Sequence, residues 1–140
     1  MEKIIAVLKK VPLFEGISDD ILLTLLEKNA YQLRSYEKGR LIFQAGDPVE
    51  NLIILAEGTI TAEMLDPSGK ALKIEDATAP QTLASAFMYG DKRKIPVNVT
   101  ATKPSKLLYI PKPEFQSMLM QSETLLTNYI DIISSRAQFL

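Results

Sequence analysis

The stretch that decides the fold is YEKGRLIFQAGDPVENLIILAEGTIT, residues 36–61. It alternates short runs of β-forming residues with turn-forming residues. The predicted strands are 40–43, 52–55 and 59–61, and the breaks between them hold Gly39, Gly46, Gly58 and the pair Asp47-Pro48. Glycine adopts positive φ without a steric cost, and proline after aspartate presets a turn, so each break indicates a corner. Short strands with regular corners predict a rolled antiparallel β-structure.

The strand-and-turn pattern continues to about residue 110. Asp66-Pro67-Ser68-Gly69 suits a hairpin loop between predicted strands 59–65 and 71–74. In residues 97–101, two valines and an alanine alternate with polar residues, which is typical of a half-buried strand. A last apolar run ends at Ile110. We therefore expect a barrel over residues 31–110.

Helical patterns flank this barrel. Residues 1–30 form a predicted N-terminal helical segment, in which Ser18 is the expected N-cap of a helix. The expected apolar face of that helix is Ile21, Leu22, Leu25 and Leu26. After the barrel, the pattern predicts a short helix over 114–120 and a longer one from 122. The longer helix carries a seam with the 4-3-4-3 spacing of a coiled coil, formed by Leu126, Ile130, Ile133, Ala137 and Leu140.

Composition excludes several classes of function. The chain has 140 residues, of which 46% are hydrophobic, and suits one compact domain. It has neither cysteine nor histidine, so disulfides, cysteine-ligated clusters, most zinc sites, His-ligated haem and histidine catalysis are excluded. The net charge of −1 and the dispersed basic residues indicate no DNA-binding face within these residues. The lack of a long apolar run or a secretory signal predicts a cytoplasmic protein.

In order and spacing, these features resemble the cyclic-nucleotide-binding domain of the Crp/Fnr (catabolite activator) family. The stretch 36–61 and the segment LKKVPLFEGIS, residues 8–18, carry the resemblance together with the leucine-rich helix that follows. The resemblance implies a mainly β fold with flanking helices, built on a double-stranded β-helix (jelly-roll) barrel. It also implies an effector domain over 1–121, a dimerisation helix that starts in 122–140, and a helix-turn-helix DNA-binding domain that is absent from this chain.

The expected ligand site is the interruption of the sheet at PQTLASAFMY, residues 80–89, with the loop 90–95. We expect a short helix here, whose free N–H groups favour an anion, and a basic loop that supplies opposing charge. A basic loop is also often only a solvated loop. The candidate ligand-binding residues are Thr82, Leu83, Ala84, Ser85, Arg93, Lys94 and Asn98.

The motif that holds cyclic nucleotides in this family is altered. Relatives that bind them carry Gly-Glu at the start of the short helix and Arg-Ser/Thr before the next strand. By alignment the first pair falls on Ala84-Ser85, and the second falls on Ile95-Pro96 or on Lys94 with its neighbour. Serine offers no carboxylate, lysine offers a point charge in place of a fork, and proline has no N–H. The resemblance therefore predicts altered or lost cyclic-nucleotide binding, with another small-molecule effector or none.

Three functions remain open at this level. The favoured one is the effector-sensing and homodimerisation domain of a Crp/Fnr-type transcription regulator, with DNA and RNA polymerase as further partners. The second is a stand-alone β-barrel module that regulates a partner protein without touching DNA. The third, a metal-free cupin-like enzyme, is disfavoured because Ser85 has no evident base and the acidic side chains are expected to face solvent. Those acids are Glu57, Glu63, Asp66, Glu75 and Asp76. We expect no catalytic and no metal-binding residue.

Overall fold

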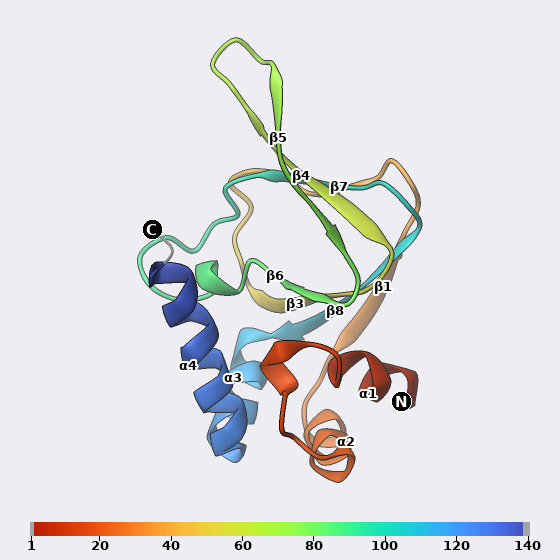
Figure 1. Cartoon of the computed structure of the whole chain (residues 1–140), viewed down its shortest axis with the longest axis vertical. Helices are drawn as coiled ribbons and strands as arrows, with labels where there is room; N and C mark the ends of the chain where they lie inside the picture. The colour runs from red at the N-terminus through yellow and green to blue at the C-terminus, as the bar shows by residue number, and fades with distance from the viewer. Residues whose placement is uncertain (1, 139–140) are drawn as a thin grey trace.

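The computed structural model describes residues 2–138 and shows a β-barrel with helices packed at one end (Figure 1). The barrel consists of two four-stranded antiparallel sheets, ordered β1-β8-β3-β6 and β2-β7-β4-β5. The strands are β1 (Gln32–Tyr36), β2 (Leu41–Phe43), β3 (Asn51–Glu57), β4 (Thr59–Leu65), β5 (Ala71–Thr78), β6 (Gln81–Leu83), β7 (Asn98–Ala101) and β8 (Ser105–Pro111). The predicted jelly-roll fold is thereby confirmed.

The helices precede and follow the barrel in the chain. They are α1 (Glu2–Leu8), η1 (Pro12–Phe14), α2 (Asp19–Lys28), η2 (Ser85–Phe87), α3 (Lys112–Gln121) and α4 (Glu123–Gln138). Ser18 caps α2 as predicted, because its side chain accepts a hydrogen bond from the Ile21 N–H at 3.3 Å. The predicted apolar face of α2 was wrong at Ile21, which is 49% exposed. This side chain lies in the first turn of α2, on the solvent side of the buried leucines.

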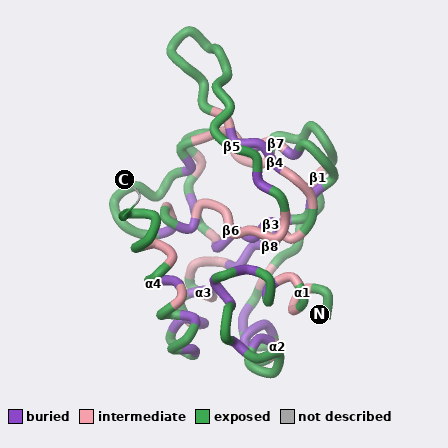
Figure 2. The backbone as a smooth tube through the Cα atoms, viewed as in Figure 1, coloured by how far each residue is buried: buried purple, intermediate pink, exposed green. Residues whose placement is uncertain are grey.

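Two hydrophobic clusters share the strands β3 and β8, whose side chains are buried on both faces (Figure 2). In β3, Leu52 and Ile54 pack toward the helices, whereas Ile53 and Leu55 pack inside the barrel. Side chains of a strand alternate between its faces, so a continuous apolar run serves two cores at once. This explains why residues 52–55 contain no polar residue, and it fixes the helices against one sheet.

Gly58 is required by a close approach between chain segments. It joins β3 to β4 with a φ of +97°, and a Cβ at this position would collide with Ser105 and with the backbone carbonyl of Pro104. Positive φ and lack of space both favour glycine here. The predicted corner between these strands is confirmed.

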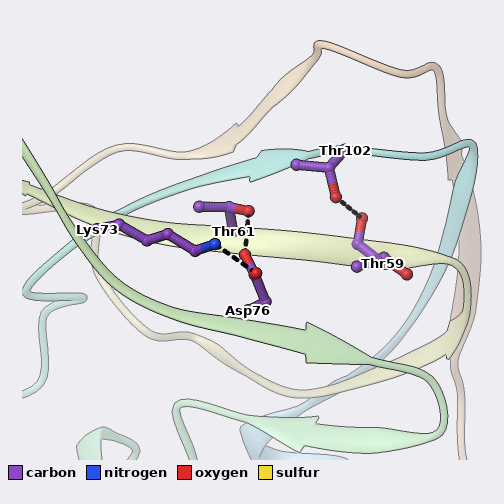
Figure 3. Close-up of polar contacts among 5 residues, drawn as sticks. All are labelled: Thr59, Thr61, Lys73, Asp76 and Thr102. Carbon is purple, nitrogen blue, oxygen red and sulfur yellow. Dashed lines mark hydrogen bonds and ion pairs between the residues drawn. The ribbon is translucent and has the colours of Figure 1, made fainter.

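The hairpin β4–β5 projects from the barrel at the top of Figure 1. Its turn forms as predicted, with the Asp66 carboxylate accepting hydrogen bonds from the backbone N–H groups of Ser68 and Lys70 at 2.9 Å. Nearer the barrel, Asp76 accepts a hydrogen bond from the Thr61 hydroxyl at 2.6 Å and pairs with Lys73 at 2.5 Å (Figure 3). On the other edge of β4, the Thr102 hydroxyl donates to the Thr59 carbonyl at 3.2 Å. These contacts tie the base of the hairpin to the sheet.

The expected helix over residues 80–89 is corrected by the structure. Residues Gln81–Leu83 form β6, which pairs with β3, and Ser85–Phe87 form only a single 3-10 turn, η2. Pairing with the exposed edge of β3 satisfies backbone groups that a longer helix would have satisfied internally. In residues 2–138, no helix has the length and apolar character needed to cross a bilayer.

Candidate functional site

A cavity of about 210 Å³ lies between the two sheets, where β6 and η2 meet the end of α4. Its wall comes from inward-facing positions of neighbouring strands, since alternate residues of a strand share one face. Ile60 and Ala62 of β4 face Ala77 and Glu75 of β5 across the hairpin register. Two of these positions are alanines, whose small side chains leave the space unfilled. The remaining wall is Phe43, Ile74, Leu83, Ala84, Phe87, Ile95, Pro96, Val97, Val99 and Arg136.

Only two of the wall residues carry charge. Glu75 comes from β5 and Arg136 from the last turn of α4. Both side chains are exposed enough to meet solvent, and neither forms an ion pair with another described residue. All the other wall residues are apolar. The site is therefore an apolar chamber with one carboxylate and one guanidinium on its wall.

Ala84 turns the chain from β6 into η2 with a left-handed backbone. Its φ of 55° makes it the one non-glycine residue with positive φ among those that the structure describes. The Phe87 N–H then donates to the Ala84 carbonyl at 3.0 Å, which closes the single turn of η2. A left-handed residue at this point is where glycine has the lowest strain. The backbone thus has the form that the glycine of the family motif would favour, although the residue is alanine.

A hydrogen bond joins η2 to α4. The Tyr129 hydroxyl donates to the Ser85 carbonyl at 3.1 Å, and the ring of Tyr129 stacks edge-on with those of Phe115 and Tyr89, at centroid distances of 5.2 Å and 6.2 Å. Burial, and to a smaller extent the neighbouring Tyr89, raises the pKa of Tyr129 to about 12. The turn that borders the cavity is therefore attached directly to the terminal helix.

Of the predicted ligand-binding residues, Leu83 and Ala84 lie on the cavity wall. Thr82 and Ser85 instead face a separate hollow between β6, η1 and α4. The buried Thr82 hydroxyl has no hydrogen-bond partner within residues 2–138. This division follows from strand alternation, because Thr82 and Leu83 are adjacent and must point to opposite faces of β6.

The other three predicted residues lie away from the cavity wall. Arg93 and Lys94 are exposed in the loop before β7, where their backbones contact the segment around Pro48 and Val49. Asn98 has a structural role, since its side-chain oxygen accepts a hydrogen bond from the Ala45 N–H at 2.7 Å. The loop therefore reaches the cavity wall through Ile95, but its basic side chains do not line the cavity.

Reasoning from the sequence missed both charged wall residues. Glu75 was expected to face solvent, and it is exposed, but it also lines the cavity; no role was expected for Arg136. A signal for Arg136 was available, because it follows Tyr129 and Ile132 at spacings of seven and four residues. These spacings place the three residues on one helix face, and the burial of Tyr129 identifies that face as the one turned toward the barrel. Glu75 had no comparable signal, because its strand lies mostly in solvent.

The predicted seam of α4 lies largely on an exposed face beside the one that carries Tyr129 and Arg136. Leu126 and Ile130 are 36% and 48% exposed, and Ala137 is exposed as well. Ile133 is half-buried and packs against the core, and Leu140 lies outside the described residues. The buried face of α4 carries Leu125 and Tyr129.

Within the described chain, no group of three acidic, cysteine or histidine side chains converges as a metal site would require.

Residues 33–122 match the sequence profile of the cyclic nucleotide-binding domain. None of the curated proteins matches the chain significantly. A transcriptional regulator from Thermotoga maritima is 33% identical, with a TM-score of 0.76 over 84% of this chain and 90% of that one. The sensor domain of the transcriptional regulator DNR from Pseudomonas aeruginosa is 25% identical, with a TM-score of 0.79 over 94% and 86%. The catabolite activator protein of Thermus thermophilus shares the fold at 18% identity and a TM-score of 0.78, over 91% of this chain and 58% of that protein.

Proposed function

Because the chain belongs to the cyclic nucleotide-binding domain family and resembles the sensor domains of Crp/Fnr-type transcription regulators, we propose that it is the effector-sensing domain of such a regulator. The role is regulatory rather than catalytic. The effector binds in the cavity between the sheets, and the DNA-binding part of the regulator lies outside these residues. The observation that carries this proposal is the contact of one short turn, η2, with both the cavity and α4.

The proposed signal passes through η2 and the inner face of α4. Ala84 and Phe87 flank Ser85 in the chain and line the cavity, while the Ser85 carbonyl accepts the hydrogen bond from Tyr129. Arg136 of the same helix reaches the cavity wall directly. A ligand that binds one position of α4 better than another shifts the helix between these positions. Such a differential affinity is what allosteric coupling requires.

The proposed output is the pairing of α4 with a second copy of the chain. Support comes from the exposure of Leu126 and Ile130, which lie beside the buried face that carries Tyr129. Burial of large apolar side chains of this kind contributes about 1.5–3 kcal/mol each. Rotation or displacement of α4 by the effector would then change the geometry of the pair, and with it the spacing of the attached DNA-binding domains.

We also propose that the cavity does not hold cyclic nucleotides in the manner of the family. The Arg-Ser/Thr pair of the family motif aligns either with Ile95-Pro96, which line the wall, or with Lys94 and its neighbour, and Lys94 does not line the wall; Ser85 aligns with the glutamate of the motif. Loss of one partner of a desolvated charged hydrogen bond costs about 2–5 kcal/mol. Calorimetry should therefore detect no micromolar binding of cyclic AMP or cyclic GMP, and micromolar binding of either would contradict this part of the proposal.

The experiment for the proposed function begins with protein purified from its own host. Native mass spectrometry should reveal a co-purified small molecule, and hydrogen exchange should show slower exchange in η2 and α4 when that molecule is bound. Ala62→Leu fills the cavity and should abolish both effects. Ala71→Leu makes the same change at an exposed site of β5 and serves as the control. The proposal fails if no host molecule binds in the cavity, or if binding leaves exchange in α4 unchanged.

A further inference from the structure

From the chemistry of the cavity wall, and resting on the proposed function, we infer that the effector is a small apolar carboxylate whose hydrocarbon body fills the barrel and whose single negative charge binds Arg136. The hydrocarbon part of the ligand would contact almost only apolar side chains of the wall, such as Ile60, Leu83 and Val99. A polar ligand body would lose its hydrogen bonds to water here and find few replacements. An apolar body loses nothing comparable and gains from burial.

The volume limits the size of that body. The cavity measures about 210 Å³. An apolar cavity of about 150 Å³ holds one benzene molecule, so this one accommodates an aromatic ring or branched chain with a short substituent. The purine, sugar and phosphate of a nucleotide together exceed such a space. The ligand is therefore about the size of an aromatic or branched-chain acid.

Arg136 defines the polar end of the ligand. Its guanidinium has no hydrogen-bond or ion-pair partner in the described part of the chain, although it borders the cavity. A guanidinium presents a planar fork of donors that matches a carboxylate with two parallel hydrogen bonds. The exposed position of this residue in the last turn of α4 lets the ligand's charge stay close to solvent while its body is buried.

Glu75 restricts the ligand to one negative charge. This exposed residue lines the same cavity, so a dianion such as a phosphate monoester would have one of its charges repelled by the Glu75 carboxylate. Pro96 contributes no backbone N–H that could stabilise a second anionic group. A hydroxyl or amino group on the ligand would instead find an acceptor in Glu75. The wall thus selects a monoanion and tolerates a donor.

The test compares carboxylic acids with their amides, which have nearly the same shape and no charge. Calorimetry on the full chain uses the pairs isovalerate and isovaleramide, phenylacetate and phenylacetamide, and 3-phenylpropionate and its amide. We expect at least one acid to bind roughly tenfold or more tightly than its amide. A ratio of dissociation constants of this size corresponds to the free energy of one hydrogen-bonded pair in which a partner is charged. In Arg136→Gln this ratio should fall to about one, and Arg136→Lys should retain part of it.

The matched control is Arg93→Gln, which removes the same charge from an exposed loop that does not line the cavity. It should leave the preference for acids unchanged. Circular dichroism checks that all variants fold. The inference is overturned if amides bind as tightly as acids, if both arginine variants lose binding equally, or if no acid binds below about 10 mM.

The outcome also separates this inference from the proposed function. If the molecule that co-purifies from the host binds in the cavity but is neutral or dianionic, the inference fails and the sensing function stands. If no molecule from the host occupies the cavity and no acid binds, both fail. If the host molecule is a monocarboxylate whose affinity depends on Arg136, both are supported.

Discussion

Ala84 occupies a backbone conformation that its side chain disfavours. A non-glycine residue with φ of 55° carries a strain of about 1–2 kcal/mol, because its Cβ approaches the following carbonyl oxygen. Surrounding contacts hold the residue there: β6 pairs with β3 on one side, and η2 closes on the other. The strained residue lies on the cavity wall, so the site includes a turn whose local energy could be lowered by a single substitution.

We predict that Ala84→Gly raises the free energy of unfolding by up to about 1 kcal/mol. The relief of left-handed strain exceeds the entropy of about 0.5–1 kcal/mol that glycine loses on folding. Urea denaturation measures the change. Ala77→Gly is the matched control, since Ala77 is buried in a regular strand and its replacement should be destabilising. Equal destabilisation by the two substitutions would show that Ala84 is unstrained.

Asp76 provides a second prediction at this scale. Its hydrogen-bonded ion pair with Lys73, and next the Thr61 hydroxyl, hold the pKa of this carboxyl below its ordinary value of 3.8. Because the pKa is lowered, the ionised carboxylate stabilises the folded state, and this stabilisation is fully present above pH 3.8. The stabilisation is lost as the pH falls through the folded-state pKa. Asp76→Asn should therefore lower the melting temperature slightly at pH 7. In acid, the variant and the unmutated chain should have the same melting temperature.

The control for this prediction is Asp91→Asn. Asp91 is an exposed loop acid without an ion pair in residues 2–138, so its replacement should leave the melting temperature unchanged at both pH values. A difference for Asp76→Asn that persists unchanged as the carboxyl is titrated in acid would mean that the lost contact is steric rather than electrostatic.

At the scale of elements, η2 and α4 form the contact through which the cavity can influence the terminal helix. The contact consists of the hydrogen bond from Tyr129 to the Ser85 carbonyl and of the edge-on ring contact between Tyr129 and Tyr89, which follows η2 in the chain. Aromatic pairs of this geometry contribute about 0.5–1.5 kcal/mol beyond burial. α4 is also held to the segment around η1, because the Asn128 side-chain amide donates to the carbonyls of Leu13 and Glu15 at 3.0 Å and 2.8 Å, so a displacement of η2 would move α4 relative to this second attachment.

We predict that Tyr129→Phe lowers the free energy of unfolding by about 1 kcal/mol at neutral pH, through loss of that hydrogen bond. The pKa of Tyr129 is raised from 10.0 to about 12, so its neutral form stabilises the folded state fully below pH 10. This contribution disappears as the pH rises through 12, because the unfolded chain ionises first. The stability difference should thus narrow between pH 10 and pH 12 in denaturant titrations. A constant difference across this range would show that Tyr129 ionises equally in both states.

At the scale of the whole molecule, α4 presents two different faces. Its inner face meets the cavity and η2, and its outer face carries the exposed seam residues Leu126 and Ile130. A second exposed apolar group lies on the projecting hairpin β4–β5, at Met64, Leu65, Leu72 and Ile74. A helix placed between a ligand cavity and an apolar outer surface is well suited to convert ligand binding into a change of assembly.

We predict that the chain forms a dimer through the outer face of α4 and that Ile130→Glu makes it monomeric. A buried charge without a partner is strongly unfavourable at such an interface, whereas Ile130 is exposed within one chain and its replacement should not unfold the domain. Light scattering at micromolar concentration measures the mass. Thr127→Glu changes an exposed residue beside the seam and should leave the dimer intact. A monomeric unmutated chain would contradict the prediction.

The sequence by itself determined the barrel and its turns, because these depend on local preferences and on strand periodicity. The hairpin turn at Asp66 and the cap at Ser18 are each decided by a few neighbouring residues, whereas the lack of space for a side chain at Gly58 comes from Pro104 and Ser105. The run 52–55 likewise predicted a strand. Only the tertiary structure decided that this strand is buried on both faces, which residues around β6 face the cavity, and that the basic side chains of the loop 90–95 do not line it.

The physical reason is that a cavity wall is assembled from residues far apart in the chain. Glu75 and Arg136 reach the same chamber because β5 pairs with β4 and the end of α4 packs beside η2. Neither fact depends on the residues adjacent to them. Likewise, pairing of residues 81–83 with β3 replaced the helix that their local pattern favoured. Local preferences determine the helices, strands and turns, whereas long-range packing determines which side chains line the cavity between them.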